Sequence, residues 1–337
     1  MADPTPGNGT YSGLGQNLGN DVTAVIQMIT NNMDQIIQQE AKTNGMQASP
    51  QFVQSLGNAG QVKLATLETT GLGNYDKIKG YPMGQATLTW QAYTLEYDRA
   101  LKVVIDSRDQ QETAGLLTAA ATFAELTRSQ VVPELDATRM ARLYSRLNAL
   151  KDANDPNVVT AAKPTKANAV STLIEYLNRV ENITGQDTGL TVYVNAELKS
   201  IFDLSSEVTL NKSVDGAGNA ITIQNRTING HNLVYVPSAR MKTTITLNDG
   251  YTNALTDEDD LSSVDPSKYG FTGGAKSIWY AITPPGVANA VTVINKPKYI
   301  TAEASEQFDG DSIAYRIYHD LIVPKNKAPA AFMLVQS

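Results

Sequence analysis

Residues 85–106 read QATLTWQAYTLEYDRALKVVID, and residues 107–150 continue as SRDQQETAGLLTAAATFAELTRSQVVPELDATRMARLYSRLNAL. The first of these segments alternates apolar and polar side chains with the two-residue period of a β-strand. Leu88 and Trp90 share one parity, whereas the apolar positions further along have the other, and this change predicts a bulge near Gln91–Ala92. At about 3.3 Å per residue the segment would reach roughly 60 to 70 Å, which is too long for the core of one compact domain.

The second segment has the pattern of a long amphipathic helix. Ser107 and Asp109 are both placed to cap its start, because a Gln or Glu follows each of them three residues later. The whole run to Leu150 would span about 60 Å at 1.5 Å per residue. Pro133 lacks a backbone N–H, so we expect a kink there. The apolar stripe consists of Leu116, Ala120, Phe123, Leu126, Val131, Met140, Leu143 and Leu147.

The stretches TLTWQAYTLEYDRALKVVIDSRDQQETAG and RSQVVPELDATRMARLYSRL resemble the major capsid proteins of tailed bacteriophages, which have the Hong Kong 97-type fold. The close resemblance covers about a fifth of the chain, and the remainder matches only in the order of its elements. The specific positions are Tyr97, Asp98, Arg99, Val104, Asp106, Glu112, Thr113, the segment Val131–Asp136, and Arg139.

The resemblance implies an α+β chain with the tailed-phage major capsid (Hong Kong 97-like) fold. Such a chain has an N-terminal arm, an extended β-hairpin loop, a long spine helix, a peripheral domain and an axial domain. The expected boundaries are 1–60 for the arm, 61–105 for the hairpin loop, 106–165 for the spine helix with part of the peripheral domain, 166–290 for the axial domain and 291–337 for the return strands of the peripheral domain.

The resemblance also implies a structural function without catalysis. The chain would assemble with itself, as pentamers and hexamers, into the icosahedral shell that encloses the double-stranded DNA of a tailed phage. Its expected place is the virion, after assembly in the host cytoplasm. A separate scaffolding protein and a portal are implied as partners, because some sixty residues ahead of the hairpin leave little room for a scaffolding segment in the chain itself.

The amino-acid composition disfavours several classes of protein, among them metalloenzymes, DNA-binding proteins and membrane proteins. The chain has no cysteine and two histidines, His231 and His319, which leaves little material for metal sites, a Ser-His-Asp triad or a cofactor site, so we expect none of these. A net charge of -7 disfavours tight DNA binding, although a shell can enclose DNA without affinity for it. No apolar run approaches the roughly 18 residues of a membrane span, and the polar start does not read as a signal peptide.

The strand ending at residue 106 has an expected partner in residues 61–68, where Val62, Leu64 and Thr66 alternate with polar positions. A glycine-rich loop connects the two, which indicates a hairpin arm. An isolated hairpin is marginal in water, and little nearby sequence is left to cover both of its faces. We therefore expect a second copy of the chain to cover it, the alternative being a hairpin folded back over its own domain. The candidate contact residues on the hairpin are Trp90, Tyr93 and Tyr97.

Charged residues give a second set of contact candidates. Asp98 and Arg99 are adjacent on the strand and should point to opposite faces. Glu134, Asp136 and Arg139 lie on the helix with Arg142, and Asp136 and Arg139 are three residues apart. Two interpretations remain open: exposed ion pairs worth at most about 1 kcal/mol, which we favour, or clamps between subunits.

Two other functions are compatible with the sequence. An encapsulin-type compartment that encloses cargo enzymes would use the same fold. A hydrolase with paired carboxylates is the second alternative, since Asp and Glu are the only plentiful catalytic side chains, but nothing in the sequence places two of them in one cleft. The acidic run Asp257–Asp260 misses the calcium-loop spacing, and GFTGGAKS at residues 270–277 lacks the glycine that a phosphate-binding loop needs before its lysine.

Local signals outside the long strand and helix predict the remaining elements. The glycine-rich first twenty residues indicate a flexible arm, followed by a helix from Asp21 to about Gly45. Asn168 and Asn195 are expected helix caps, and Asn229-Gly230 predicts a tight hairpin turn because both residues accept positive φ. The strands from residue 277 onward are expected to return to the hairpin and the long helix.

Overall fold

The computed structural model describes residues 14–47, 53–56, 61–78, 80–112, 119–151, 156–186, 189–205, 208–214, 220–250, 269–304 and 309–337. Residues 1–13 of the predicted arm and the acidic run 257–260 lie outside this set. The chain divides into two compact units. Unit 1 comprises residues 1–40, 98–132 and 294–317, and unit 2 comprises residues 41–97, 133–293 and 318–337.

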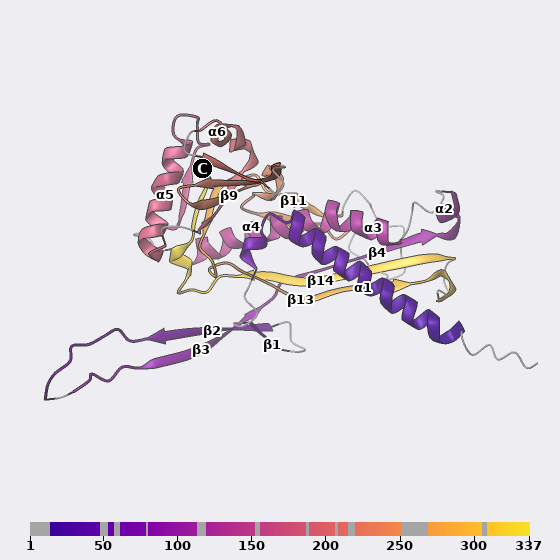
Figure 1. The fold of residues 1–337 in the computed structure, drawn as a ribbon, viewed down its shortest axis with the longest axis horizontal. Helices are drawn as coiled ribbons and strands as arrows, with labels where there is room; N and C mark the ends of the chain where they lie inside the picture. The colour runs from indigo at the N-terminus through magenta and orange to yellow at the C-terminus, as the bar shows by residue number, and fades with distance from the viewer. Residues whose placement is uncertain are drawn as a thin grey trace, which may run out of the picture. The chain divides into compact units, whose positions relative to one another are not determined.

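Unit 1 is built from helices packed on one side of a three-stranded sheet (Figure 1). The sheet has the strand order β13 (Asn289–Ile300), β14 (Gly310–Ile322) and β4 (Tyr97–Asp106), with β13 and β14 continuing into unit 2. Tyr315 of β14 packs edge-on against Phe123, with ring centroids 5.4 Å apart, and donates a 2.9 Å hydrogen bond to Asn295. Asn295 in turn donates to Asp34 at 3.3 Å. Asp34 belongs to helix α1 (Leu14–Glu40) and Phe123 to helix α3 (Ala119–Leu126), so these contacts hold both helices against one face of the sheet.

The first helix is longer at its start than the sequence predicted. Helix α1 spans Leu14–Glu40, so it begins within the stretch expected to be flexible and ends before Gly45. A short 3-10 turn, η1 (Asn44–Met46), follows it. The side chains of Ile29, Met33 and Ile37 are buried along one stripe of α1. Burial of this apolar face stabilises the part of α1 that carries it.

The long helix is interrupted rather than simply kinked. It is formed by α3 (Ala119–Leu126), the π-helical segment η3 (Thr127–Val131) and α4 (Val132–Ala149). Pro133 cannot donate to the carbonyl of Ser129, and the wider π-helical turn lies directly before it. We attribute the change of helical register to that missing donor.

The start of the predicted helix is a separate short element. Helix α2 spans Ser107–Glu112, and residues 113–118 lie outside the described residues. The Asp106 carboxylate accepts a 2.8 Å hydrogen bond from the backbone N–H of Arg108, so a residue one position earlier than expected satisfies a first-turn donor. The Ser107 hydroxyl donates instead to Asp309 at 3.0 Å.

The predicted continuous strand is two strands in different sheets. Strand β3 (Ala86–Thr94) ends at Thr94 and β4 begins at Tyr97, so the break falls at Leu95–Glu96 and not at the predicted position near Gln91. β3 pairs with β2 (Gln61–Thr69), which also pairs with β1 (Val53–Leu56), a strand that the sequence did not indicate. The register of β3 against β2 runs unbroken through Gln91 and Ala92, so the predicted bulge is absent there. The change of apolar parity between Trp90 and Tyr93 falls within β3 and marks a change in which face of the hairpin is apolar.

Unit 2 contains a mixed sheet of seven strands among the described residues. Its order is β5 (Val158–Ala161), β15 (Phe332–Gln336), β12 (Ile278–Thr283), β6 (Thr191–Asn195), β9 (His231–Val236), β8 (Ala220–Ile228) and β7 (Val208–Val214). β15 is parallel to β5, and β6 is parallel to β9. A separate two-stranded sheet pairs β10 (Ile245–Leu247) with β11 (Phe271–Gly273).

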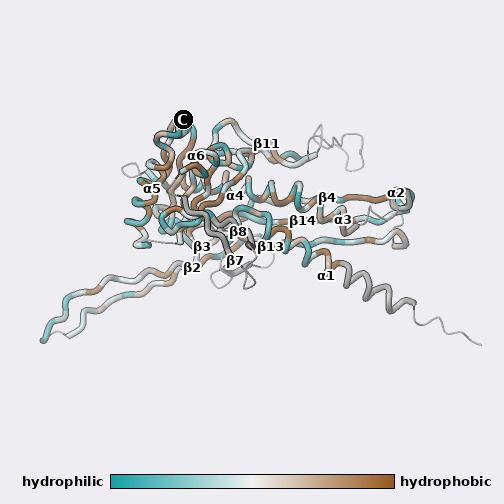
Figure 2. The backbone as a smooth tube through the Cα atoms, turned by 45° about the horizontal axis from the view of Figure 1, so that its top comes forward, coloured by the Kyte–Doolittle hydropathy of each residue, from teal (hydrophilic) through white to brown (hydrophobic). Residues whose placement is uncertain are grey.

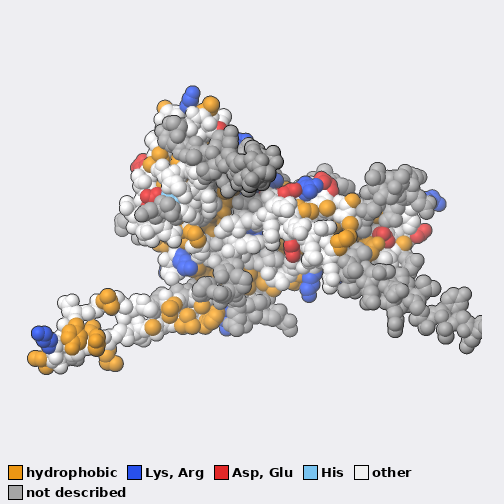
Figure 3. Space-filling model, viewed as in Figure 1, with side chains coloured by type: hydrophobic (Ala, Val, Ile, Leu, Met, Phe, Trp, Pro, Cys, Tyr) orange, Lys and Arg blue, Asp and Glu red, His pale blue; other side chains and the backbone are white. Residues whose placement is uncertain are grey.

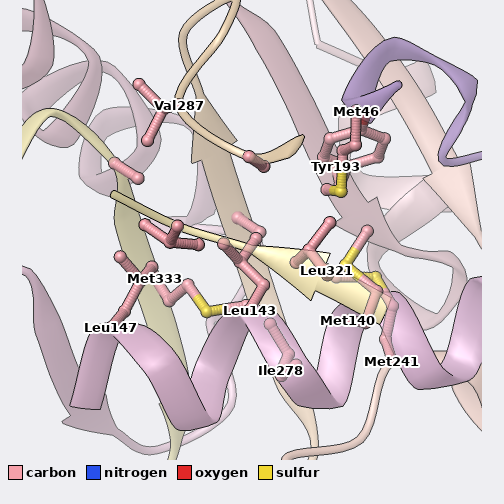
Figure 4. Packing of buried hydrophobic residues seen from close by; sticks show 14 of the residues in the cluster. Met46, Met140, Leu143, Leu147, Tyr193, Met241, Ile278, Val287, Leu321 and Met333 are labelled. Carbon is pink, nitrogen blue, oxygen red and sulfur yellow. The ribbon is translucent and has the colours of Figure 1, made fainter. Parts of the chain in front are cut away.

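Each face of the seven-stranded sheet has its own apolar core. Met140, Leu143 and Leu147 of α4 pack with Met333 and Ile278 on one face, as Figure 4 shows. The other face is covered by α5 (Ala169–Thr184) and α6 (Lys199–Asp203), which pack against Trp279, Tyr280 and Ile282 of β12. Ile278 and Ala281 of β12 belong to the first core and Trp279, Tyr280 and Ile282 to the second, so this strand contributes to both. A register shift between Ile278 and Tyr280 accompanies the placement of the neighbours Trp279 and Tyr280 in one core.

Several local predictions are confirmed in unit 2. Asn195 accepts a 3.1 Å hydrogen bond from the N–H of Glu197, as expected for a cap. Helix α5 begins directly after Asn168, but the Asn168 side chain makes no cap hydrogen bond and accepts instead from the N–H of Thr165 at 2.7 Å. Asn229 and Gly230 both have positive φ, 49° and 82°, as the predicted hairpin turn requires. His231 and His319 are both buried.

The placement of the last strands was partly wrong. β13 and β14 join β4, as expected for return strands. β12 and β15 instead lie side by side in the seven-stranded sheet, between β5 and β6. β15 reaches that position through its pairing with β5, which lies just before the boundary expected at residue 165. The sequence pattern identified these strands but carried no information on their partners.

Candidate functional site

The hairpin formed by β2 and β3 is the best candidate for a functional surface. Nine consecutive residue pairs connect the strands, from Gln61 opposite Thr94 to Thr69 opposite Ala86. Figure 1 shows the hairpin extending away from the seven-stranded sheet of the same unit, and Figure 2 shows hydrophobic residues along both of its strands. The register decides which side chains lie next to each other on each face.

One face of the hairpin carries a continuous exposed apolar surface. Leu67 lies directly opposite Leu88, and Ala65 directly opposite Trp90, so the four side chains adjoin. The exposed fractions are 65% for Leu67, 55% for Leu88 and 46% for Trp90. We call these four residues the hairpin patch; the hydrophobic side chains along the hairpin are visible in Figure 3. The predicted shared face of Leu88 and Trp90 is confirmed.

The opposite face is buried at the base of the hairpin. Val62 and Leu64 are almost fully buried and pack with Leu95, Val291 and Ile322. Tyr93 lies opposite Val62 and packs at the edge of this cluster, so it faces away from Trp90 as the parity predicted. The hairpin is thus anchored at its base within unit 2 while the hairpin patch stays exposed.

The connecting loop of the hairpin exposes further apolar side chains that the sequence interpretation missed. The loop, residues 70–85, closes through backbone hydrogen bonds between Asp76 and Gly80 at 2.8 and 3.2 Å, and Gly80 has a φ of 78°. The Asp76 carboxylate also accepts from the N–H of Ile78 at 2.7 Å. The strongly exposed residues are Leu72, Tyr75, Ile78, Tyr81 and Met83. Five large apolar residues in a glycine-rich loop were the available signal.

A cluster of charged and aromatic side chains holds the point where the chain leaves the hairpin. Arg142 of α4 contacts Glu96 at 2.5 Å and binds both carboxylate oxygens of Asp320 at 3.0 Å. Its guanidinium lies 5.7 Å from the ring centroid of Tyr97, which stacks on His319. Tyr97, a predicted contact residue, therefore has partners for its ring within the chain, and its contact with a neighbouring subunit stays a prediction.

The two carboxylates of this cluster respond differently to their surroundings. The hydrogen bond from Arg142 lowers the pKa of Glu96, which lies near the surface. Burial raises the pKa of Asp320, and the bidentate contact with Arg142 opposes that rise. The guanidinium thus links a buried carboxylate to one at the surface, at the base of the hairpin.

The structure corrects the interpretation of Asp136 and Arg139. Both were expected to form exposed pairs or contacts between subunits, but Asp136 is 0% exposed and Arg139 is 3% exposed. Asp136 accepts hydrogen bonds from the backbone N–H and hydroxyl of Thr43 at 3.0 and 2.7 Å and pairs with Arg240 at 3.0 Å. Arg139 donates to the Thr43 hydroxyl at 3.0 Å. These residues fasten the segment after α1 to α4 and present no surface to another subunit.

The other charged candidates lie nearer the surface. Asp98 forms a bidentate pair with Arg316, at 2.9 and 2.5 Å, which lowers the pKa of Asp98. Arg99 and Glu134 are half-buried, and Arg142 is mostly buried. Asp98 is exposed and its neighbour Arg99 is not, in agreement with the predicted alternation along β4. A role of Asp98, Arg99 and Glu134 in contacts between subunits stays a prediction.

Within the described ranges, the structure brings together no group of three or more His, Asp or Glu side chains suited to hold a metal ion. The described helices likewise include none that is both long and apolar enough to cross a bilayer.

Comparison with known proteins gives likeness in structure only. No protein-family model and no curated protein sequence matches the chain. A solved structure from Mycobacterium phage Che8 matches with a TM-score of 0.52 and 15% identity, covering 88% of this chain and 90% of that one. The mature capsid of bacteriophage PhiM1 matches with a TM-score of 0.52 and 13% identity, covering 87% of this chain and 86% of that one. The chain has the fold of the tailed-phage major capsid proteins, the Hong Kong 97-type fold.

Proposed function

We propose that the chain is a major capsid subunit that assembles with itself into the closed shell of a tailed phage and encloses double-stranded DNA. The fold supports this function, and the observation that carries it is the exposed hairpin patch. Monomeric soluble proteins rarely leave contiguous apolar surfaces of this kind uncovered unless they bind something. A second copy of the chain is the natural occupant, because a closed shell repeats one contact many times.

The hairpin patch is suited to carry such a contact. Trp90 is 46% exposed, and covering that half of a large aromatic side chain would contribute about 3 kcal/mol before ordering costs. The buried base formed by Val62 and Leu64 fixes the orientation of the strands, which lowers the entropy lost on binding. We propose that Trp90 contacts the adjacent subunit together with the exposed apolar residues of the loop. Tyr93, half-buried at the edge of the base cluster, would contact it from the other face with the part of its ring that stays exposed.

Purification followed by negative-stain microscopy tests the proposal. Closed particles are the expected result, either from the chain alone or after co-expression with a scaffolding protein. The same proposal implies a portal protein as a partner and the virion as the location of the chain. A chain that stays monomeric at high concentration under both conditions would contradict it. Particles filled with protein and free of nucleic acid would instead support the encapsulin-type compartment. Hydrolytic activity of a monomer would favour the carboxylate enzyme.

A further inference from the structure

The three-stranded sheet of unit 1 carries a basic groove that the proposed shell function leaves unexplained. The groove has a volume of about 500 Å³ and is lined by residues of β4, β13 and β14. We define the basic groove by its cationic side chains and its small ones: Lys102, Lys296, Lys298, Arg316, Ala100 and Ala314. None of the residues that line it is acidic.

The sheet pattern explains why the groove is concave. β14 is the central strand, and its small side chain at Ala314 leaves a depression between longer side chains on the two flanking strands. Lys296 and Lys298 are two residues apart on β13, so they point to the same side of the sheet about 6.6 Å from each other. Tyr315, the next residue along β14, packs against Phe123 on the opposite face, so the groove lies on the side turned away from that helix.

The charge of the groove comes mainly from lysine. Arg316 lines the groove, but its guanidinium is bound by both oxygens of the Asp98 carboxylate. Lys296 and Lys298 are exposed and supply positive charge beside an alanine floor. Two lysines about 6.6 Å apart on one strand suit a ligand with carboxylates at alternate positions, since an extended peptide repeats the side chains of one face every two residues. The small alanine floor leaves room for the backbone of such a peptide.

We propose that the basic groove binds an extended acidic segment of another protein, with carboxylates at alternate positions opposite Lys296 and Lys298. Charge complementarity and the spacing of the two lysines favour this occupant over a second copy of the chain. The net charge of -7 opposes a nucleic acid and an acidic peptide alike, and the DNA probe in the test below separates the two. The hairpin loop of a second copy carries two lysines, Lys77 and Lys79, and one acidic residue, Asp76. Its net charge is therefore positive, like that of the groove.

Fluorescence anisotropy with the full-length subunit tests this proposal. The probes are a short labelled peptide with aspartate at alternate positions and valine between them, the same peptide with asparagine in place of aspartate, and single-stranded DNA. We expect the acidic peptide to bind about tenfold more weakly to K296Q/K298Q than to the unmutated chain. The charge-preserving variant K296R/K298R should retain binding. K276Q/K325Q removes the same charge from exposed positions outside the groove and should bind normally.

The alternatives give different results. Equal binding of the asparagine peptide would show that charge does not direct recognition and would overturn the proposal. The proposal would also be overturned if DNA binds, the acidic peptide does not, and K296Q/K298Q loses the binding of DNA. That result would assign the groove to a nucleic acid. If no probe binds and K296Q/K298Q reduces self-association in sedimentation, the occupant is a second copy and the proposal is wrong. Absence of any effect in all assays would also overturn it.

Discussion

Leu67 of β2 and Leu88 of β3 lie directly opposite each other, and both side chains are more than half exposed. Such a pair stabilises a hairpin only weakly while it faces water, so its apolar area is available for a contact with another molecule. Three positions away on β2, Leu64 is almost fully buried. The hairpin thus presents one face to its own unit and leaves the other uncovered.

Substitution of Trp90 by alanine is expected to separate assembly from folding. Because Trp90 is 46% exposed, its removal should change the free energy of unfolding by no more than about 1 kcal/mol, whereas particle yield should fall several-fold. Denaturant unfolding and quantification of particles by sedimentation measure the two effects. Leu204→Ser, which alters a 77% exposed apolar residue outside the hairpin, should leave particle yield unchanged. Normal particle yield from Trp90→Ala would count against the hairpin patch as an interface.

Leu64→Ala and Leu67→Ala form a matched pair on the same strand. Leu64 is 4% exposed and packs in the cluster at the hairpin base, so its truncation should cost about 2–4 kcal/mol of unfolding free energy. Leu67 is 65% exposed and should cost less than about 0.5 kcal/mol, but its loss should lower particle yield. Urea titration of both variants checks the first effect and electron microscopy the second. Equal destabilisation by the two substitutions would mean that the hairpin folds back in solution and buries both faces.

The sequence predicted the hairpin face because strand periodicity alone assigns side chains to sides. Leu88 and Trp90 share a parity, and their exposure follows from the lack of sequence nearby to cover them. The same reasoning failed at Leu95–Glu96, where the chain passes from one sheet to another, because periodicity does not reveal which strands pair. It also gave no hint that β15 would insert between β5 and β12, which depends on contacts between residues far apart in the sequence.

The misjudged residues on the long helix have a common physical cause. Charged residues are rarely buried without partners, so Asp136 and Arg139 were expected at the surface. Their partners, Thr43 and Arg240, come from segments roughly a hundred residues away, and only the folded chain brings them together. Patterns within one helix cannot indicate such a buried network.

Asp136→Ala should destabilise the chain strongly. Its carboxylate accepts hydrogen bonds from Thr43 and pairs with Arg240, so removal leaves buried donors without an acceptor and should cost about 3–5 kcal/mol. Glu134→Gln, on the same turn of α4 and half-buried, serves as the control and should change stability by less than about 0.5 kcal/mol. Thermal unfolding followed by circular dichroism measures both. A loss of particles without a loss of stability in Asp136→Ala would contradict the buried role and return Asp136 to the subunit surface.

The contact between Glu96 and Arg142 should make the stability of the hairpin base depend on pH. Arg142 lowers the pKa of Glu96 below its ordinary value of 4.5, so the ionised form stabilises the folded chain above that pH. This contribution is lost as the pH falls through the lower pKa of the folded state. The denaturation midpoint of Glu96→Gln should therefore lie below that of the unmutated chain at pH 7, and the difference should shrink as the pH falls below 4.5.

Urea titrations of both proteins across this pH range test the effect. Glu197→Gln, which removes a carboxylate paired with Lys163 far along the chain, is the control for general charge loss. A difference between Glu96→Gln and the unmutated chain that is the same at every pH would show that the ionised form of Glu96 is not what Arg142 recognises.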